Sequence, residues 1–262
     1  MDWTDTWRDA FRTELRAEAI GFACHGWPVV PGTYPSGSNW VGRGAGRQPA
    51  GVGGPVPVHP HFAELAGGGP EEVARLWAGH PFSVLLATGL GVDALDLPAD
   101  VGRGTAIGLR VAGLPVPIAA TPAGRWIFPV AGGGVLHPAL VDHPDVVLHA
   151  DGSWVPLPPS PCLPGVVHWR VKPGVRGWQL PRLHDVADAV LAATGETQCL
   201  QVTDQLKTGH VPLVIQPQPA AHRRWRDQAH PGVEADRPYA DTGTGSQLRD
   251  GQRVGHERPF PT

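Results

Sequence analysis

Glycine and proline make up about a quarter of this chain: 35 glycines and 30 prolines recur among 262 residues without a regular period. Glycine lowers the stability of a helix, and proline interrupts both helices and sheet hydrogen bonding. Long helices therefore cannot fill the chain, and the lack of a three-residue repeat excludes collagen. We expect short helices and strands separated by many turns.

Hydropathy, charge and cysteine content narrow the class of protein. No stretch approaches the roughly 18–20 apolar residues of a membrane-spanning helix, and the acidic start lacks the basic segment of a signal peptide. We therefore expect a cytoplasmic protein with no membrane partner. The net charge of −3 is unlike that of proteins that bind DNA mainly through nonspecific phosphate contacts. Three cysteines without a Cys-x-x-Cys spacing argue against a disulfide framework and a structural zinc site.

Apolar periodicity predicts a mixture of helices and strands over residues 1–215. Spacings of three and four residues predict helices over 4–25, 70–78, 100–112 and 183–193. Short β-type runs predict strands over 27–31, 82–87, 92–97, 116–120, 125–130, 146–149, 154–157 and 166–171. The first of these strands should leave its sheet at Pro31, and residues 32–60 should form a long loop. The order of elements, with mostly antiparallel strands in the second part, favours an α+β domain.

Residues 216–262 contain almost no aliphatic side chains. Such a segment cannot bury enough apolar surface to offset the entropy of ordering it. The sequence therefore predicts one folded domain, residues 1–215, followed by a disordered tail.

Two acidic residues lie on the predicted strand 92–97. Asp93 and Asp96 should point to opposite faces of a sheet, because side chains alternate along a strand. A carboxylate two residues beyond Asp96 would share its face, but that position is Pro98. Asp96 is thus a candidate metal ligand. The alternative is that both carboxylates close a strand end or cap the following helix.

Arg125 and Trp126 lie on a predicted hairpin that leads into the glycine-rich stretch 131–134. Backbone amides of such a turn can bind phosphate, but no phosphate-binding glycine motif opens a helix here, so a flexible hairpin turn is the better interpretation. Arg125 could point into a cleft. Trp126 fits a core position better than a surface for stacking a base.

Asp151 precedes Gly152, and this pair is typical of a tight turn between strands. Asp151 could equally complete a metal site with Asp96, because metal sites for nucleotidyl transfer draw carboxylates from different strands. Neither a zinc-protease spacing of histidines nor a nucleophile elbow occurs in the sequence.

Six stretches follow one another at spacings typical of a known family. They are Gly26-Trp-Pro-Val-Val-Pro31, Arg75-Leu-Trp77, Leu86-Ala-Thr-Gly89, Ala94-Leu-Asp96, Gly124-Arg-Trp-Ile-Phe128, and Trp154-Val-Pro-Leu-Pro-Pro-Ser160 with Gly165 and His168-Trp169. Together they resemble the N-terminal domain of bifunctional DNA primase/polymerases, the prim-pol family, over about residues 8–195. The resemblance implies an archaeo-eukaryotic primase-like mixed sheet with flanking helices.

The resemblance also implies template-directed nucleotidyl transfer with Mg²⁺ or Mn²⁺. The implied partners are single-stranded DNA, nucleoside triphosphates and a separate helicase or replication protein. Asp96 matches the first metal-binding acid of the family and Asp151 the third, so these two are the expected catalytic and metal-binding residues. Arg125, Ser160 and Arg170 are the expected nucleotide-binding residues.

Two positions depart from the family pattern. Pro98 stands where the family has its second acid, and Trp126 stands where it has a histidine that binds nucleotide phosphate. Loss of one carboxylate should lower the rate of a two-metal reaction by orders of magnitude. Three functions remain open: a divergent but active DNA primase/polymerase, an inactive pseudo-primase that binds nucleotide or nucleic acid and acts through a partner, and a purely structural module.

Overall fold

The protein is described by a computed structural model that covers residues 3–36, 39–42, 48–49, 54–163 and 165–208. The helices, in chain order, are α1 (Trp3–Cys24), α2 (Phe62–Leu65), α3 (Pro70–Leu76), α4 (Ala99–Val111), α5 (Pro138–Val141), the 3-10 helix η1 (Pro173–Arg176) and α6 (Leu183–Thr208). The strands are β1 (Val29–Gly32), β2 (Tyr34–Ser36), β3 (Asn39–Val41), β4 (Gln48–Pro49), β5 (Ser83–Ala87), β6 (Val92–Pro98), β7 (Ile118–Ala120), β8 (Arg125–Ala131), β9 (Val147–His149), β10 (Trp154–Pro156), β11 (Pro161–Cys162), β12 (Gly165–Val166) and β13 (His168–Val171). This mixture confirms the predicted α+β class.

A five-stranded sheet in the order β13-β7-β8-β6-β9 forms the centre of the molecule. Its neighbouring strands all pair antiparallel, as the sequence predicts. The edge strand β9 lies next to β6, although β7 and β8 separate the two along the chain. The register therefore places Val147 of β9 opposite Asp96 of β6, and His149 opposite Ala94.

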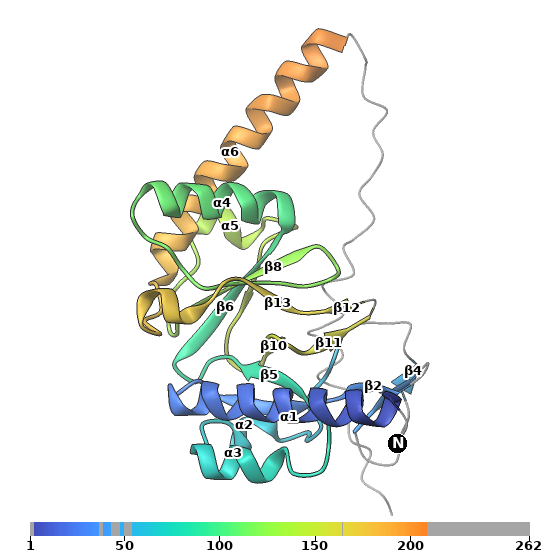
Figure 1. Ribbon diagram of the computed structural model, residues 1–262. Helices are drawn as coiled ribbons and strands as arrows, with labels where there is room; N and C mark the ends of the chain where they lie inside the picture. Colours follow the sequence, from blue (N-terminus) through green and yellow to red (C-terminus); the bar gives the residue numbers. More distant parts are fainter. Residues whose placement is uncertain (1–2, 37–38, 43–47, 50–53, 164, 209–262) are drawn as a thin grey trace, which may run out of the picture.

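Helices α4 and α6 cover one face of this central sheet (Figure 1). The face is apolar because alternate residues of β6 and β8, such as Leu95, Leu97 and Phe128, point toward the helices and are buried. Helix α6 begins as predicted, but it continues beyond the predicted end at 193 to Thr208 and extends away from the body of the protein (Figure 1).

A second sheet, in the order β1-β5-β10, lies toward α1 and α3 (Figure 1). A second core joins α1 and α3 to both sheets and contains Phe22, Trp77, Leu86 and Ile127. Strand β1 continues through Pro31, which pairs with Val84, so the prediction that the strand leaves the sheet at this proline is wrong. An edge position explains this outcome, because an edge strand tolerates a missing N–H.

The predicted loop 32–60 is wrong in part. Strands β2, β3 and β4 form a small antiparallel sheet within it. These strands have only two or three residues, too few to produce an alternating apolar pattern. Residues 216–262, the predicted tail, lie outside the described residues. None of the described helices is both long enough and apolar enough to cross a membrane.

Candidate functional site

A pocket of about 240 Å³ lies between the central sheet and strands β10 and β11. Most of its wall is apolar, and its polar groups gather on the side of the central sheet. The lining residues are Gly54, Asp96, Thr121, Ala123, Arg125, Ile127, Val147, His149, Trp154, Val155, Pro156, Cys162 and Leu163.

The strand register explains why the polar side chains share this pocket. Residues directly opposite in an antiparallel pair point to the same face of the sheet. Asp96 is opposite Ile127 on β8 and Val147 on β9, and Pro98 is opposite Arg125. The face turned away from α4 and α6 therefore carries Asp96 and Arg125 together with His149.

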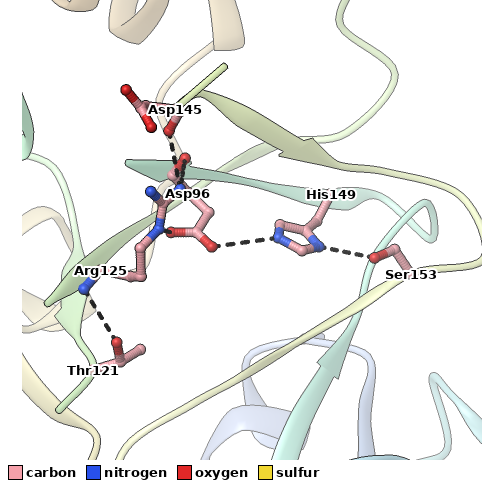
Figure 2. Close-up of polar contacts among 6 residues, drawn as sticks. All are labelled: Asp96, Thr121, Arg125, Asp145, His149 and Ser153. Atoms are coloured by element: carbon pink, nitrogen blue, oxygen red, sulfur yellow. Dashed lines mark hydrogen bonds and ion pairs between the residues drawn. The ribbon is translucent and has the colours of Figure 1, made fainter. Parts of the chain in front are cut away.

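Arg125 and Asp96 form a partly buried ion pair (Figure 2). The Nε atom of Arg125 donates to Oδ1 of Asp96 at 2.9 Å. Its Nη2 atom donates to the backbone carbonyl oxygens of Asp96 and Asp145, each at 3.0 Å. The side chains of Arg125 and Asp96 are only 11% and 15% exposed, so the guanidinium is held firmly and its charge is balanced by the carboxylate.

His149 approaches the other oxygen of the same carboxylate (Figure 2). Its Nε2 atom lies 3.6 Å from Oδ2 of Asp96, and its Nδ1 atom is hydrogen-bonded to Oγ of Ser153 at 2.8 Å. The β9–β10 turn thus holds the imidazole on one side, while Asp96 faces it on the other.

The structure separates Trp126 from its neighbour Arg125. Alternation along β8 turns Arg125 into the pocket and Trp126 into the core beneath α4, where the indole is buried. A residue at position 126 therefore does not face the pocket, whatever its type. Arg170, on the exposed side of β13, lies over the Trp126 ring with its guanidinium carbon 5.3 Å from the ring centroid.

Asp151 lies in the exposed turn after β9 and is not among the residues that line the pocket. The pairing of β9 with β6 ends at His149, so Asp151 has no partner residue on β6. Its backbone packs against the Gly89 turn, where a Cβ atom on Gly89 would lie 2.3 Å from Cα of Asp151. The two expected metal ligands are therefore not brought together.

Ser160 and Asp93 have structural partners. The Ser160 hydroxyl is fully buried, accepts from the backbone N–H of Val84 at 2.7 Å and donates to its carbonyl at 2.9 Å. Asp93 accepts from the backbone N–H groups of Gly89 and Gly133 at 3.0 and 2.9 Å, and so joins two turns on the face opposite Asp96. The nucleotide-binding roles expected for Ser160, Arg125 and Arg170 stay predictions.

His149 is the pocket residue that sequence reasoning missed. His149 and Val147 are two residues apart, so both lie on the same face of a short strand. The sequence contains no signal that shows which other strand pairs with this strand. Only the pairing of β9 with β6 brings the imidazole to Asp96.

The family model described as bifunctional DNA primase/polymerase, N-terminal (Prim-Pol) matches residues 19–190, about two thirds of the chain. The chain belongs to the Prim-Pol family. No curated protein and no solved structure gives a significant match. The Prim-Pol match covers every residue that lines the pocket.

Prim-Pol membership implies a divalent metal ion, so the pocket can be tested for ligands. Mg²⁺ prefers several oxygen ligands in near-octahedral geometry. The described residues that line the pocket of this Prim-Pol chain contribute one carboxylate, Asp96, and Oδ1 of that carboxylate already accepts from Arg125. Within the described residues, no group of three His, Cys, Asp or Glu side chains could hold a metal ion. The donor set that these described residues provide does not fit a catalytic metal ion.

Proposed function

We propose that this Prim-Pol chain is a DNA primase/polymerase-like domain that binds nucleotides in its pocket and does not carry out nucleotidyl transfer. One observation carries the proposal: among the described residues that line the pocket, Asp96 is the single carboxylate, and an arginine neutralises it. Two-metal nucleotidyl transfer requires carboxylates that are free to hold cations between the attacking and leaving oxygens. A guanidinium in contact with Asp96 opposes the approach of a cation.

Family membership supports nucleotide binding at this place, and it supports the expected primase-like architecture. The pocket has the properties of a small-molecule site, because apolar walls enclose a few convergent polar groups. Single-stranded DNA, a helicase or another replication protein are the proposed partners through which a non-catalytic domain would act.

An active primase/polymerase is the second candidate, and the family match is the observation that favours it. Activity would require that Arg125 release Asp96. It would also require that other carboxylates approach Asp96. The sequence resemblance would make Asp151 one of them.

Primer synthesis and extension on single-stranded DNA with Mg²⁺ or Mn²⁺ distinguishes the two candidates. We expect no product from the wild-type chain, together with nucleotide binding detected by calorimetry. A chain with Asp96→Ala and Asp151→Ala serves as the background for contaminating polymerase. Extension by the wild-type chain that disappears in this double variant would refute the proposal and establish an active metal site.

A further inference from the structure

The pocket contains two polar atoms that face each other without a direct hydrogen bond. Oδ2 of Asp96 and Nε2 of His149 are 3.6 Å apart, beyond the length of a good hydrogen bond. Both residues line the pocket, and the other oxygen of Asp96 is already occupied by Arg125. A ligand that enters the pocket therefore meets these two atoms side by side.

The surroundings of His149 favour a proton on Nε2. A lone pair on Nε2 would be repelled by the carboxylate of Asp96, whereas an Nε2–H group is attracted to it. The proton is therefore favoured on Nε2, and Nδ1 then accepts a hydrogen bond from the Ser153 hydroxyl at 2.8 Å. The pair presents one acceptor, Oδ2, beside one donor, Nε2–H.

The complementary ligand carries a donor beside an acceptor. On the Watson–Crick edge, adenine and cytosine have this pattern, with an exocyclic amino group next to an unprotonated ring nitrogen. Hypoxanthine and uracil have nearly the same shapes but reverse the pattern, since a carbonyl stands beside a ring N–H. The apolar side chains of Ile127, Val147 and Val155 suit a flat ring.

The charge and volume of the pocket do not favour a triphosphate. Arg125 is the one Lys or Arg among the described residues that line it, and its Nε and Nη2 atoms donate to protein acceptors. The volume of about 240 Å³ is below the roughly 300 Å³ typical of the smallest pockets for drug-sized ligands. A base fits, and phosphates would extend outward.

We infer that the pocket recognises the base of adenine or cytosine nucleosides through Asp96 and His149, without a metal ion and without a contribution from phosphate. This inference rests on the proposed function and specifies its ligand.

Isothermal titration calorimetry of the full chain tests the inference with matched ligands. We expect adenosine to bind at least about tenfold more tightly than inosine, and cytidine to bind at least about tenfold more tightly than uridine. The reversed donor and acceptor pattern of inosine and uridine would leave Oδ2 of Asp96 without a hydrogen-bond donor. ATP with Mg²⁺ and ATP with EDTA should bind within about threefold of adenosine, since neither phosphate nor metal finds a partner.

Equal affinities for adenosine and inosine would overturn the inference, and so would binding of ATP with Mg²⁺ but not of adenosine. The proposed function would stand in both cases. Failure of all nucleosides and nucleotides to bind would overturn both proposals.

A protein variant provides an independent test. His149→Phe keeps an aromatic ring and leaves the ion pair of Asp96 with Arg125 in place. We expect it to lower adenosine affinity about tenfold while the melting temperature shows that the chain is folded. His168→Phe, at an exposed position of β13, is the matched control and should bind as the wild type does. Unchanged binding by His149→Phe would refute the role of His149.

Discussion

At the scale of single residues, Arg125 has the largest structural role in the site. It joins β8 to Asp96 on β6 and to the carbonyl oxygen of Asp145 just before β9. Removal of one partner from a buried ion pair leaves the other charge without compensation. The resulting loss of folding free energy is larger than the stability that the intact pair contributes.

We therefore predict that Arg125→Met lowers the free energy of unfolding by about 3 kcal/mol. Urea denaturation monitored by tryptophan fluorescence would measure the loss. The double variant Arg125→Met, Asp96→Leu should lose less free energy of unfolding than Arg125→Met alone, because no unpaired carboxylate remains.

Arg182→Met is a suitable comparison, since Arg182 is 72% exposed and pairs with Asp185 at the surface. Its effect should stay within about 0.5 kcal/mol. A similar loss from Arg125→Met and Arg182→Met would contradict the view that Arg125 stabilises the site.

Cys162 lines the pocket but is chemically inert at neutral pH. Burial raises the pKa of its thiol from the ordinary value to about 12, so the reactive thiolate is scarce at pH 8. We predict that iodoacetamide modifies the exposed Cys24 in the native chain at pH 8 and leaves Cys162 unmodified. Peptide mass spectrometry would identify the labelled peptides, and labelling in urea should reach both Cys24 and Cys162. Rapid native labelling of Cys162 would show that the pocket wall opens readily.

At the scale of elements, the contact between α4 and β8 depends on a glycine. A Cβ atom on Gly102 would lie 2.9 Å from the Cβ atom of Trp126, so the helix could not keep its distance from the sheet. On the same helix, a Cβ atom on Gly108 would lie 3.9 Å from Ala189 of α6, which is ordinary contact.

These two glycines make a matched pair of variants. Gly102→Ala should lower the free energy of unfolding by about 1–3 kcal/mol through overpacking. Gly108→Ala should leave stability unchanged or raise it by up to about 1 kcal/mol, because alanine is the better helix former. Thermal unfolding followed by circular dichroism would measure both. An equal response at the two positions would argue against close packing of Trp126 on α4.

At the scale of the whole molecule, the pocket exists because two sheets meet along β6, β9 and β10. The central sheet supplies the charged groups, and β10 and β11 supply much of the apolar wall. The two sheets also share a core with α1 and α3, so the walls of the pocket belong to one folded unit.

The neutralised carboxylate leads to a prediction about metal ions. A metal ion that binds a native site, at a concentration 100 times its Kd, would stabilise the fold by about 2.7 kcal/mol. This stabilisation raises the Tm of a domain of this size by about 5 °C or more. We predict that neither Mg²⁺, Mn²⁺ nor EDTA shifts the Tm of the wild-type chain by that amount. Differential scanning fluorimetry would measure it, and a clear rise with Mg²⁺ that depends on Asp96 would contradict the prediction.

Local periodicity was sufficient to predict the main helices and strands, because apolar spacing along a segment depends only on that segment. It also placed Asp93 and Asp96 on opposite faces and Trp126 in the core, since alternation is a property of any strand. The ordered motifs identified the family without knowledge of any contact.

Tertiary structure decided which of these residues meet. The pairing of β9 with β6 puts His149 beside Asp96, while it leaves Asp151 near the Gly89 turn. The register also brings Arg125 to Asp96, which converts a candidate metal ligand into a neutralised ion pair. Such pairings depend on the packing of segments far apart in the chain. Local sequence therefore predicts the face on which a side chain lies, and only the assembled sheet determines its partner.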